Sequence, residues 1–236
     1  MSKELPIRQA ATVVVLRDTT QGPEVLIVQR ASELAFHGGA WVFPGGRVDA
    51  ADFATLGVSA AEGLSIPEAL EVSRRAAVRE TQEEAGLLLE HAALTPFSHW
   101  TTPVGRPRRF ATWFFAAVLE DALREVVVDG SEIHAYRWAR AGDVLRARDA
   151  GELVLPAPTF VTLTHLANYT SSASWLRALS AEPPPVYLPR LHVRDDGEVT
   201  VYQGDVAYDG GELEREGPRH RLNMLKSGWS YLRSPH

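Results

Sequence analysis

Three glutamates, Glu80, Glu83 and Glu84, lie close together in the segment RETQEEAG at 79–86. Carboxylates that are three and four positions apart share one face of a helix, where each like-charge pair costs about 0.2–0.5 kcal/mol. The same spacing presents several oxygen ligands from one rigid element, and Mg²⁺ and Mn²⁺ prefer such ligands together with water and substrate phosphates. The cluster therefore indicates a site for a hard divalent cation. The alternative is a solvated helix face on which neighbouring arginines offset the glutamates.

A helix that begins near residue 66 is expected to carry these glutamates. Residues 65–68 (SIPE) have the S-x-x-E pattern of a capping box with proline just inside the helix, and Gly86 is typical of a helix end. Mainly apolar residues form a stripe on one face, while charged residues take the other. The stripe consists of Leu70, Ala77, Val78, Thr81 and Ala85.

Several β-rich segments surround this helix in the sequence. Residues 11–17 and 24–30 are separated by the turn-like DTTQGP, so we expect them to pair. The runs at 109–119, 125–128 and 133–139 are expected to be buried strands. Because strands precede and follow the helix without strict alternation, the pattern predicts an α/β (α+β) fold with a mixed sheet.

A glycine-rich stretch at 36–53 lies between the first strands and the helix. It contains Pro44-Gly45-Gly46, in which proline fixes φ and the glycines accept positive φ. We therefore expect a tight turn there.

The character of the chain changes near residue 152. A short helix at 139–151 is expected just before this point. After it, two helices are expected within 156–181, and strands within 183–193 and 198–208. The sequence thus predicts a main domain over 8–151 and a C-terminal helical and strand extension over 152–236 that packs on it.

The composition narrows the functional classes. Hydrophobic residues make up 45% of the 236 residues, which is enough for a buried core. The net charge of −6 gives no general attraction to nucleic acid or anionic membrane, and the lack of cysteine excludes disulfides, thiolate nucleophiles and Cys-type zinc sites. The first residues, MSKELPIRQA, contain no apolar signal segment. We therefore expect a cytoplasmic protein without nucleic-acid or membrane partners.

The segment 79–87 (RETQEEAGL) resembles the core of the Nudix box, whose pattern is R-E-apolar-x-E-E-x-G-apolar. Phe43-Pro44-Gly45-Gly46 resembles the turn that opens the box in this superfamily. The chain is therefore identified as a member of the Nudix hydrolases. The resemblance implies an α/β/α sandwich with a mixed β-sheet, and hydrolysis of a diphosphate linkage that depends on Mg²⁺ or Mn²⁺.

The resemblance also implies roles for individual residues. Glu80 and Glu84 would be metal ligands, Glu83 a ligand or the general base, and the Gly46 carbonyl a further ligand. Arg79 would orient the glutamates within the catalytic centre. A second candidate for a base or metal ligand is Glu132, because many Nudix proteins have an acidic residue before the last strand of the sheet. For Glu132 the alternative is an exposed glutamate in a turn.

The spacing inside the box departs from the standard pattern. The box normally has five residues between its glycine and its first glutamate, whereas 24 residues, 47–70, separate Gly46 from Glu71. Glu71 has two candidate partners, the box arginine Arg79 or Arg75 one helical turn away. An insertion at this place resembles the coenzyme A diphosphatase branch of the superfamily.

The segment before the turn bears on the substrate. Members that cleave coenzyme A carry L-L-T-x-R-[S/A]-x3-R-x3-G-x3-F-P-G-G, and residues 26–46 follow this spacing, with Val28 in place of threonine and Ala35 in place of the second arginine. A basic loop near residue 106 also resembles this branch, and arginine suits phosphate through paired hydrogen bonds. The residues expected to bind substrate are Arg30, Phe43, Gly45, Arg106 and Arg109. For the arginines the alternative is a solvated surface.

The leading functional hypothesis is a metal-dependent hydrolase that cleaves coenzyme A or acyl-coenzyme A. The alternatives are an ADP-ribose, nucleotide-sugar or dinucleotide diphosphatase, or a Nudix-fold binding module without catalysis. The partner implied is a small nucleoside diphosphate derivative. Homodimers are common in this superfamily, so a second copy of the chain is a further candidate partner.

Overall fold

Two long strands near the N-terminus begin the main sheet of the computed structural model, which describes residues 6–33, 38–54, 65–121 and 123–234. β1 (Ile7–Thr19) and β2 (Gly22–Arg30) are antiparallel, as the sequence predicts. β1 also pairs in parallel with β6 (Arg109–Val118), so the sheet is mixed. Ala35 and residues 55–64 of the predicted insertion lie outside the described residues.

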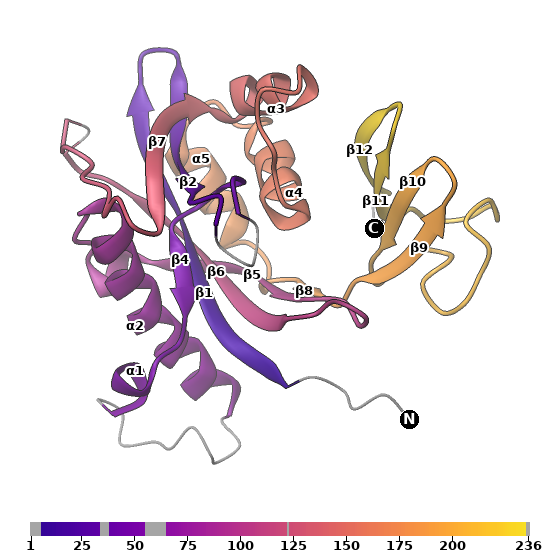
Figure 1. Ribbon diagram of the computed structural model, residues 1–236, viewed down its shortest axis with the longest axis horizontal. Helices are drawn as coiled ribbons and strands as arrows, with labels where there is room; N and C mark the ends of the chain where they lie inside the picture. Colours follow the sequence, from indigo (N-terminus) through magenta and orange to yellow (C-terminus); the bar gives the residue numbers. More distant parts are fainter. Residues whose placement is uncertain (1–5, 34–37, 55–64, 122, 235–236) are drawn as a thin grey trace.

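The strands of the main sheet follow the order β3-β2-β1-β6-β5-β8, with β4 beside β1 and β7 beside β2 (Figure 1). The additional strands are β3 (Trp41–Val42), β4 (Gly45–Arg47), β5 (Thr95–Thr101), β7 (Ile133–Arg140) and β8 (Val186–Tyr187). A single turn of 3-10 helix, His91–Ala93, precedes β5.

Helices cover both faces of this sheet, and the alternation of side chains along β1 shows how. Val13 and Val15 pack in one cluster with residues of α2 (Ile66–Ala85), whereas Val14 and Leu16 pack in the other with residues of α4 (Ala157–Leu166) and α5 (Ser172–Leu179). Successive side chains of a strand point to opposite faces, so a strand buried on both faces is apolar throughout. This arrangement confirms the α/β/α sandwich with a mixed sheet.

Local signals fix both ends of α2. The backbone N–H of Ser65 donates to the Glu68 carboxylate over 2.8 Å, which is half of the predicted capping box. At the other end Gly86 has a φ of 67°, and its N–H donates to the Gln82 carbonyl over 2.9 Å. The helix therefore has the predicted limits.

One predicted strand is wrong. Residues 125–128 are extended but belong to neither sheet, and the N–H of Val127 donates to the Ala85 carbonyl at the end of α2. The segment donates a hydrogen bond to a free carbonyl in the last turn of α2 instead of pairing with a strand of the sheet. The predicted strand at 133–139 is present as β7, but it lies at the margin of the sheet and several of its side chains are exposed rather than buried.

The predicted tight turn at Pro44-Gly45-Gly46 takes a different form. Pro44 forms a bend, and Gly45 and Gly46 already lie in β4, which pairs antiparallel with β1. Gly45 has a φ of 153°, and a Cβ there would lie 2.2 Å from the Ala11 carbonyl oxygen. The glycine is required by close contact with β1 rather than by a turn.

Gly45→Ala should therefore lower the free energy of unfolding by about 3 kcal/mol, because the added methyl group forces both a strained φ and a backbone shift. Urea denaturation of the variant and the wild type measures this change. The matched control is Gly142→Ala in α3 (Ala141–Asp149), where a Cβ meets nothing closer than the end of a side chain at 3.6 Å. That control should stay within about 1 kcal/mol of the wild type. Equal denaturation midpoints for Gly45→Ala and the wild type would contradict this account of Gly45.

The C-terminal part contributes to the main body and also forms a second sheet. The helices are α3 (Ala141–Asp149), α4 (Ala157–Leu166) and α5 (Ser172–Leu179), as predicted. The second sheet, called the C-terminal sheet below, is antiparallel and consists of β9 (Arg190–Arg194), β10 (Gly197–Val201), β11 (His220–Leu225) and β12 (Gly228–Arg233). Figure 1 shows it standing beside α4 and β8. The sequence predicted β8, β9 and β10 but not β11 and β12.

None of the helices that the structure describes combines the length and the apolar character that crossing a bilayer requires.

Candidate active site

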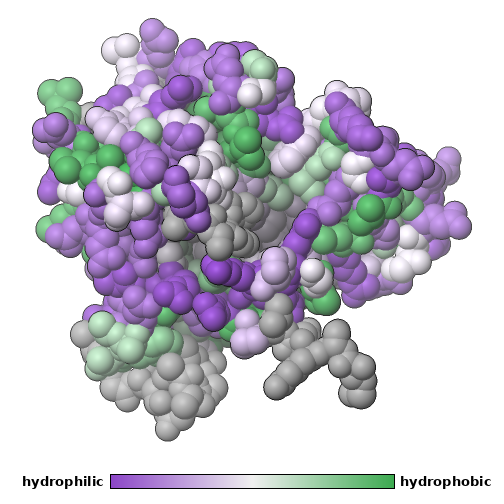
Figure 2. All heavy atoms as spheres, in the orientation of Figure 1, coloured by the Kyte–Doolittle hydropathy of each residue, from purple (hydrophilic) through white to green (hydrophobic). Residues whose placement is uncertain are grey.

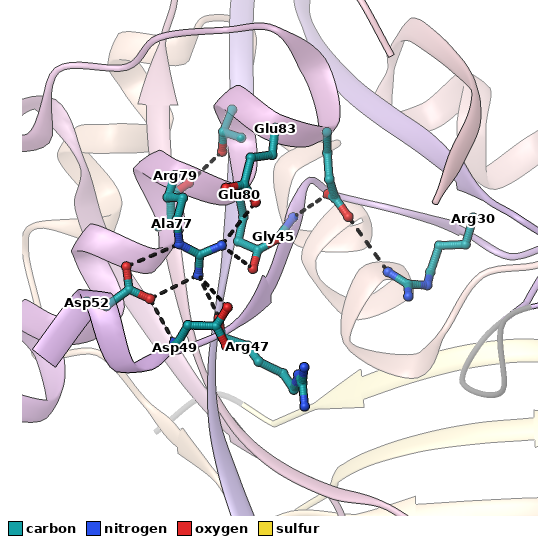
Figure 3. Close-up of polar contacts among 11 residues, drawn as sticks. Arg30, Gly45, Arg47, Asp49, Asp52, Ala77, Arg79, Glu80 and Glu83 are labelled. Atoms are coloured by element: carbon teal, nitrogen blue, oxygen red, sulfur yellow. Dashed lines mark hydrogen bonds and ion pairs between the residues drawn. The ribbon is translucent and has the colours of Figure 1, made fainter. Parts of the chain in front are cut away.

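Arg79 lies at the centre of a network of carboxylates between α2, α1 (Ala50–Ala54) and β4 (Figure 3). Its guanidinium donates to Glu80 over 2.8 Å and to Glu83 over 3.1 Å. It also donates to the Arg47 carbonyl oxygen over 2.9 Å. From the sequence we expect Arg79 to orient the glutamates. Hydrogen bonds from one guanidinium to Glu80 and Glu83 can restrict the directions of both side chains.

The strongest partner of Arg79 is a residue that the sequence analysis missed. The two oxygens of Asp52 accept from the guanidinium over 3.2 and 2.9 Å, and Asp52 is only 5% exposed. Hydrogen bonding to Asp52 is the largest of the contributions that raise the pKa of Arg79. Five residues separate Gly46 from Asp52, which is the standard spacing to the first glutamate of the box. That spacing was the signal available, with aspartate in place of glutamate.

Glu71 does not reach this network. It lies 3.3 Å from Arg75 and 3.9 Å from Arg74, so of its two candidate partners the one on the next helical turn is present. The additional residues of the box therefore follow Asp52, and the helix that carries Glu71 begins after them.

Glu84 is buried on the side of α2 that faces β4. It accepts a hydrogen bond of 2.8 Å from the Gly45 N–H, and it lies 3.8 Å from the Arg30 guanidinium. Burial raises the pKa of Glu84 to about 8, and the negative charges of Glu80 and Glu132 act in the same direction. The fold thus holds a buried carboxylate close to other carboxylates, an arrangement that a cation would stabilise.

Glu80 lies directly against the backbone of Gly46. A Cβ at Gly46 would meet the Glu80 carboxylate at 2.4–2.5 Å, so only glycine leaves room for that side chain. Burial raises the pKa of Glu80, and the charges of Glu83 and Asp49 add to the effect, although Arg79 opposes it. Gly46 and Glu80, two of the expected metal ligands, are therefore neighbours.

Glu83 and Glu132 are the two exposed members of the site. The Glu83 side chain is 59% exposed and contacts Arg79, whereas Glu132 follows a turn in which its own N–H donates to the Asp129 carboxylate over 2.9 Å. Both line the same cleft as Glu80 and Glu84. Solvent in the cleft reaches them more readily than the buried glutamates, so either can meet a water molecule there.

The donor set suits a hard cation. Within the described part of the chain, no three Asp, Glu, His or Cys side chains are already arranged around one point as metal ligands. Nevertheless Glu80 and Glu84 are carboxylates with raised pKa values beside the Gly46 backbone, and the atoms they offer are oxygens. Oxygen-only donors of this kind fit Mg²⁺ or Mn²⁺. Among the residues expected to be ligands, Glu80 and Glu83 both contact Arg79, whereas Glu84 contacts the Gly45 N–H.

The glutamates line a cleft of 790 Å³, which is within the range of small-molecule sites. Arg30, Arg106 and Arg108 also line it, so positive charge is available beside the carboxylates. Arg106 donates to both oxygens of Glu198 over 2.7 and 2.8 Å. Arg30 has a buried Nε without a hydrogen-bond partner among the described residues, although its terminal nitrogen lies near Glu84.

The other residues expected to bind substrate are placed differently. Phe43 borders the cleft but is only 2% exposed and packs in the core. Gly45 borders it as well and holds Glu84 through its N–H. Arg109 is buried, donates to the Thr102 carbonyl over 3.2 Å, and is not among the described residues that line the cleft. The structure therefore brings Arg30 and Arg106 to the cleft but not Arg109.

Comparison of the sequence and of the fold with known proteins identifies relatives in one family. Residues 6–156 match the NUDIX domain. The acyl-coenzyme A diphosphatase NUDT19 of Gallus gallus is 26% identical over 78% of this chain and 72% of its own length. The putative nudix hydrolase 7 of Caenorhabditis elegans is 28% identical over 68% of this chain and 61% of its own. The crystal structure of a NUDIX hydrolase from Alicyclobacillus acidocaldarius superimposes with a TM-score of 0.64 at 29% identity, over 75% of this chain and 99% of the other.

Proposed function

Because the chain belongs to the NUDIX family and is a NUDIX diphosphatase, we propose that its substrate is coenzyme A or an acyl-coenzyme A. The observation that carries the proposal is the cleft, which joins the glutamates of the box to an apolar region large enough for an extended substrate. Two long matches to relatives named as acyl-coenzyme A diphosphatases, at 24–26% identity, support the same substrate class.

Hydrolases of this family generally depend on divalent metal ions. In the proposed site Glu80, Glu84 and the Gly46 carbonyl would hold the ions, and Mg²⁺ or Mn²⁺ is the expected metal. When bound, the ions neutralise the diphosphate and lower the pKa of a water molecule. Asp52 keeps Arg79 in place, and Arg79 in turn fixes the direction of Glu80.

The proton of the attacking water passes to a glutamate that solvent can reach. Glu83 and Glu132 both line the cleft and are exposed, so we assign the general base to this pair. The water oxygen bonds to one phosphorus while the bridging P–O bond breaks, which leaves two phosphate monoesters. Arg30 lies at the side of the cleft next to Glu84 and is placed to contact the diphosphate oxygens.

The proposal is tested by measuring the release of phosphate monoesters from a panel of candidate substrates in the presence of Mg²⁺ or Mn²⁺. The panel holds coenzyme A, acetyl-coenzyme A, ADP-ribose, a nucleotide sugar and a dinucleotide, and kcat/KM should be highest for a coenzyme A compound. A higher kcat/KM for ADP-ribose, the nucleotide sugar or the dinucleotide would replace the proposed substrate with that class. Absence of turnover on every member would favour a binding module without catalysis.

A further inference from the structure

The C-terminal sheet forms one wall of the cleft that holds the glutamates. Its residues that line the cleft are Leu191, Glu198, Thr200, Met224 and Trp229, and Tyr202, directly after β10, lines the cleft beside them. The segment that leads into α4 and the first turn of that helix also line the cleft, with Val154, Leu155, Pro156 and Pro158. Figure 2 shows this face of the molecule hollowed between the main body and the sheet. The cleft is thus charged at the end of α2 and mainly apolar where it passes the sheet.

Several contacts hold this wall in position. Arg106, from the loop between β5 and β6, makes its paired hydrogen bonds with Glu198 of β10. The Trp229 ring of β12 packs edge-on against Phe160 of α4, with ring centroids 5.3 Å apart, and the Arg148 guanidinium lies 4.1 Å from its centroid. The wall is therefore fixed against both α4 and the loop, as a wall that selects a substrate must be.

Tyr202 supplies a polar group on the same wall. Its ring stacks edge-on against Trp100 and Tyr187, and its hydroxyl is buried with no hydrogen-bond partner among the described residues. Burying a hydroxyl without a hydrogen-bond partner is unfavourable. A ligand that offers Tyr202 a hydrogen-bonding group would therefore be stabilised at this place. A ligand chain that carries amides and then continues into an alkyl group matches this order of polar and apolar side chains along the cleft.

We infer that the C-terminal sheet is the subsite for the arm beyond the diphosphate, with Trp229 and Met224 contacting the alkyl end of that arm. The inference rests on the proposed function and deepens it, because it selects acyl-coenzyme A over coenzyme A itself. A sugar, being polar throughout, would leave the apolar surface of Met224 and Trp229 without a matching group. The preferred substrate class is therefore a nucleoside diphosphate with an extended, amide-containing arm that ends in an alkyl chain.

The test compares octanoyl-coenzyme A with coenzyme A as substrates with Mg²⁺. The wild type should have a higher kcat/KM for the octanoyl compound, and Trp229→Ala should reduce that preference about tenfold, because it removes a large apolar contact. Met224→Gln, which keeps the length of the side chain, should reduce the preference in the same direction and covers the case in which Trp229→Ala fails to fold. The matched control is Trp138→Ala, whose ring also has an arginine 4.5 Å from its centroid but is outside the set of residues that line the cleft.

Binding of the same two compounds in Ca²⁺, measured by calorimetry, separates this inference from the proposed function. Tighter binding of octanoyl-coenzyme A that Trp229→Ala weakens, together with no cleavage of either compound in the Mg²⁺ assay, would support the subsite and contradict the proposed function. Equal cleavage of both compounds by the wild type and by both wall variants would overturn the subsite and leave the proposed function standing. Failure of the wild type to bind or cleave either compound would overturn both.

Discussion

Replacing Glu84 with glutamine should lower kcat for diphosphate hydrolysis by about 10²–10³-fold, which is the loss typical of removing one preorganised charge from an active site. The amide keeps the shape of the side chain and can still accept from the Gly45 N–H, but it no longer offers a negative oxygen to a cation. Initial rates with saturating substrate and Mg²⁺ measure the change.

The same variant should not lose stability. Burial raises the folded-state pKa of Glu84 to about 8, above its ordinary value, so ionisation of the carboxylate costs stability as the pH rises through that interval. Glutamine removes this cost, and the Tm at pH 7.5 without added metal should equal or exceed that of the wild type. A variant that loses activity because it is unfolded would have a lower Tm.

Glu71→Gln is the matched control, since Glu71 lies on the same helix but pairs with Arg75. Its kcat should stay within about twofold of the wild type, because Glu71 lies outside the cleft and a partly exposed ion pair contributes about 0–1 kcal/mol. Full activity of Glu84→Gln, or an equal loss in Glu71→Gln, would contradict the assignment of Glu84 to the metal site.

Asp52→Asn should have the second largest effect, a loss of about 10–100-fold in kcat together with about 2 kcal/mol of unfolding free energy. The carboxylate of Asp52 is buried and makes two hydrogen bonds to Arg79, whereas an amide would turn its own donors toward the guanidinium. Arg79 would then direct Glu80 less well. Enzyme kinetics and urea denaturation of one preparation measure both changes.

Asp49→Asn is the control for this prediction. Asp49 is 56% exposed and lies 3.9 Å from Arg79, so its replacement should change the stability by less than about 0.5 kcal/mol. If Asp49→Asn and Asp52→Asn had equal effects, the placement of Asp52 as the principal partner of Arg79 would be wrong.

The parts of the fold that the sequence predicted carry local signals. The limits of α2 follow from the SIPE segment and Gly86, and the long strands follow from continuous apolar runs that are buried on both faces. The run at 125–128 has the same strand composition, yet it satisfies the end of α2, because tertiary contacts override β-propensity.

The missed features depend on contacts between distant residues. Asp52 and Arg79 are 27 positions apart, because additional residues separate them in the sequence. Only the spacing of five residues between Gly46 and Asp52 follows the standard box. The segment HRLNMLKSGWSYLR alternates only loosely, so β11 and β12 become apparent only through their pairing, and with them the wall that contains Met224 and Trp229.

Mass spectrometry of the products formed from coenzyme A tests the central claim most directly. With Mg²⁺, the wild type should convert coenzyme A into equal amounts of adenosine 3′,5′-bisphosphate and 4′-phosphopantetheine, and Glu84→Gln or removal of the metal with a chelator should suppress both products together. Intact coenzyme A and intact octanoyl-coenzyme A after incubation with the folded wild type and Mg²⁺, or the same products at the same rate from Glu84→Gln, would contradict the account.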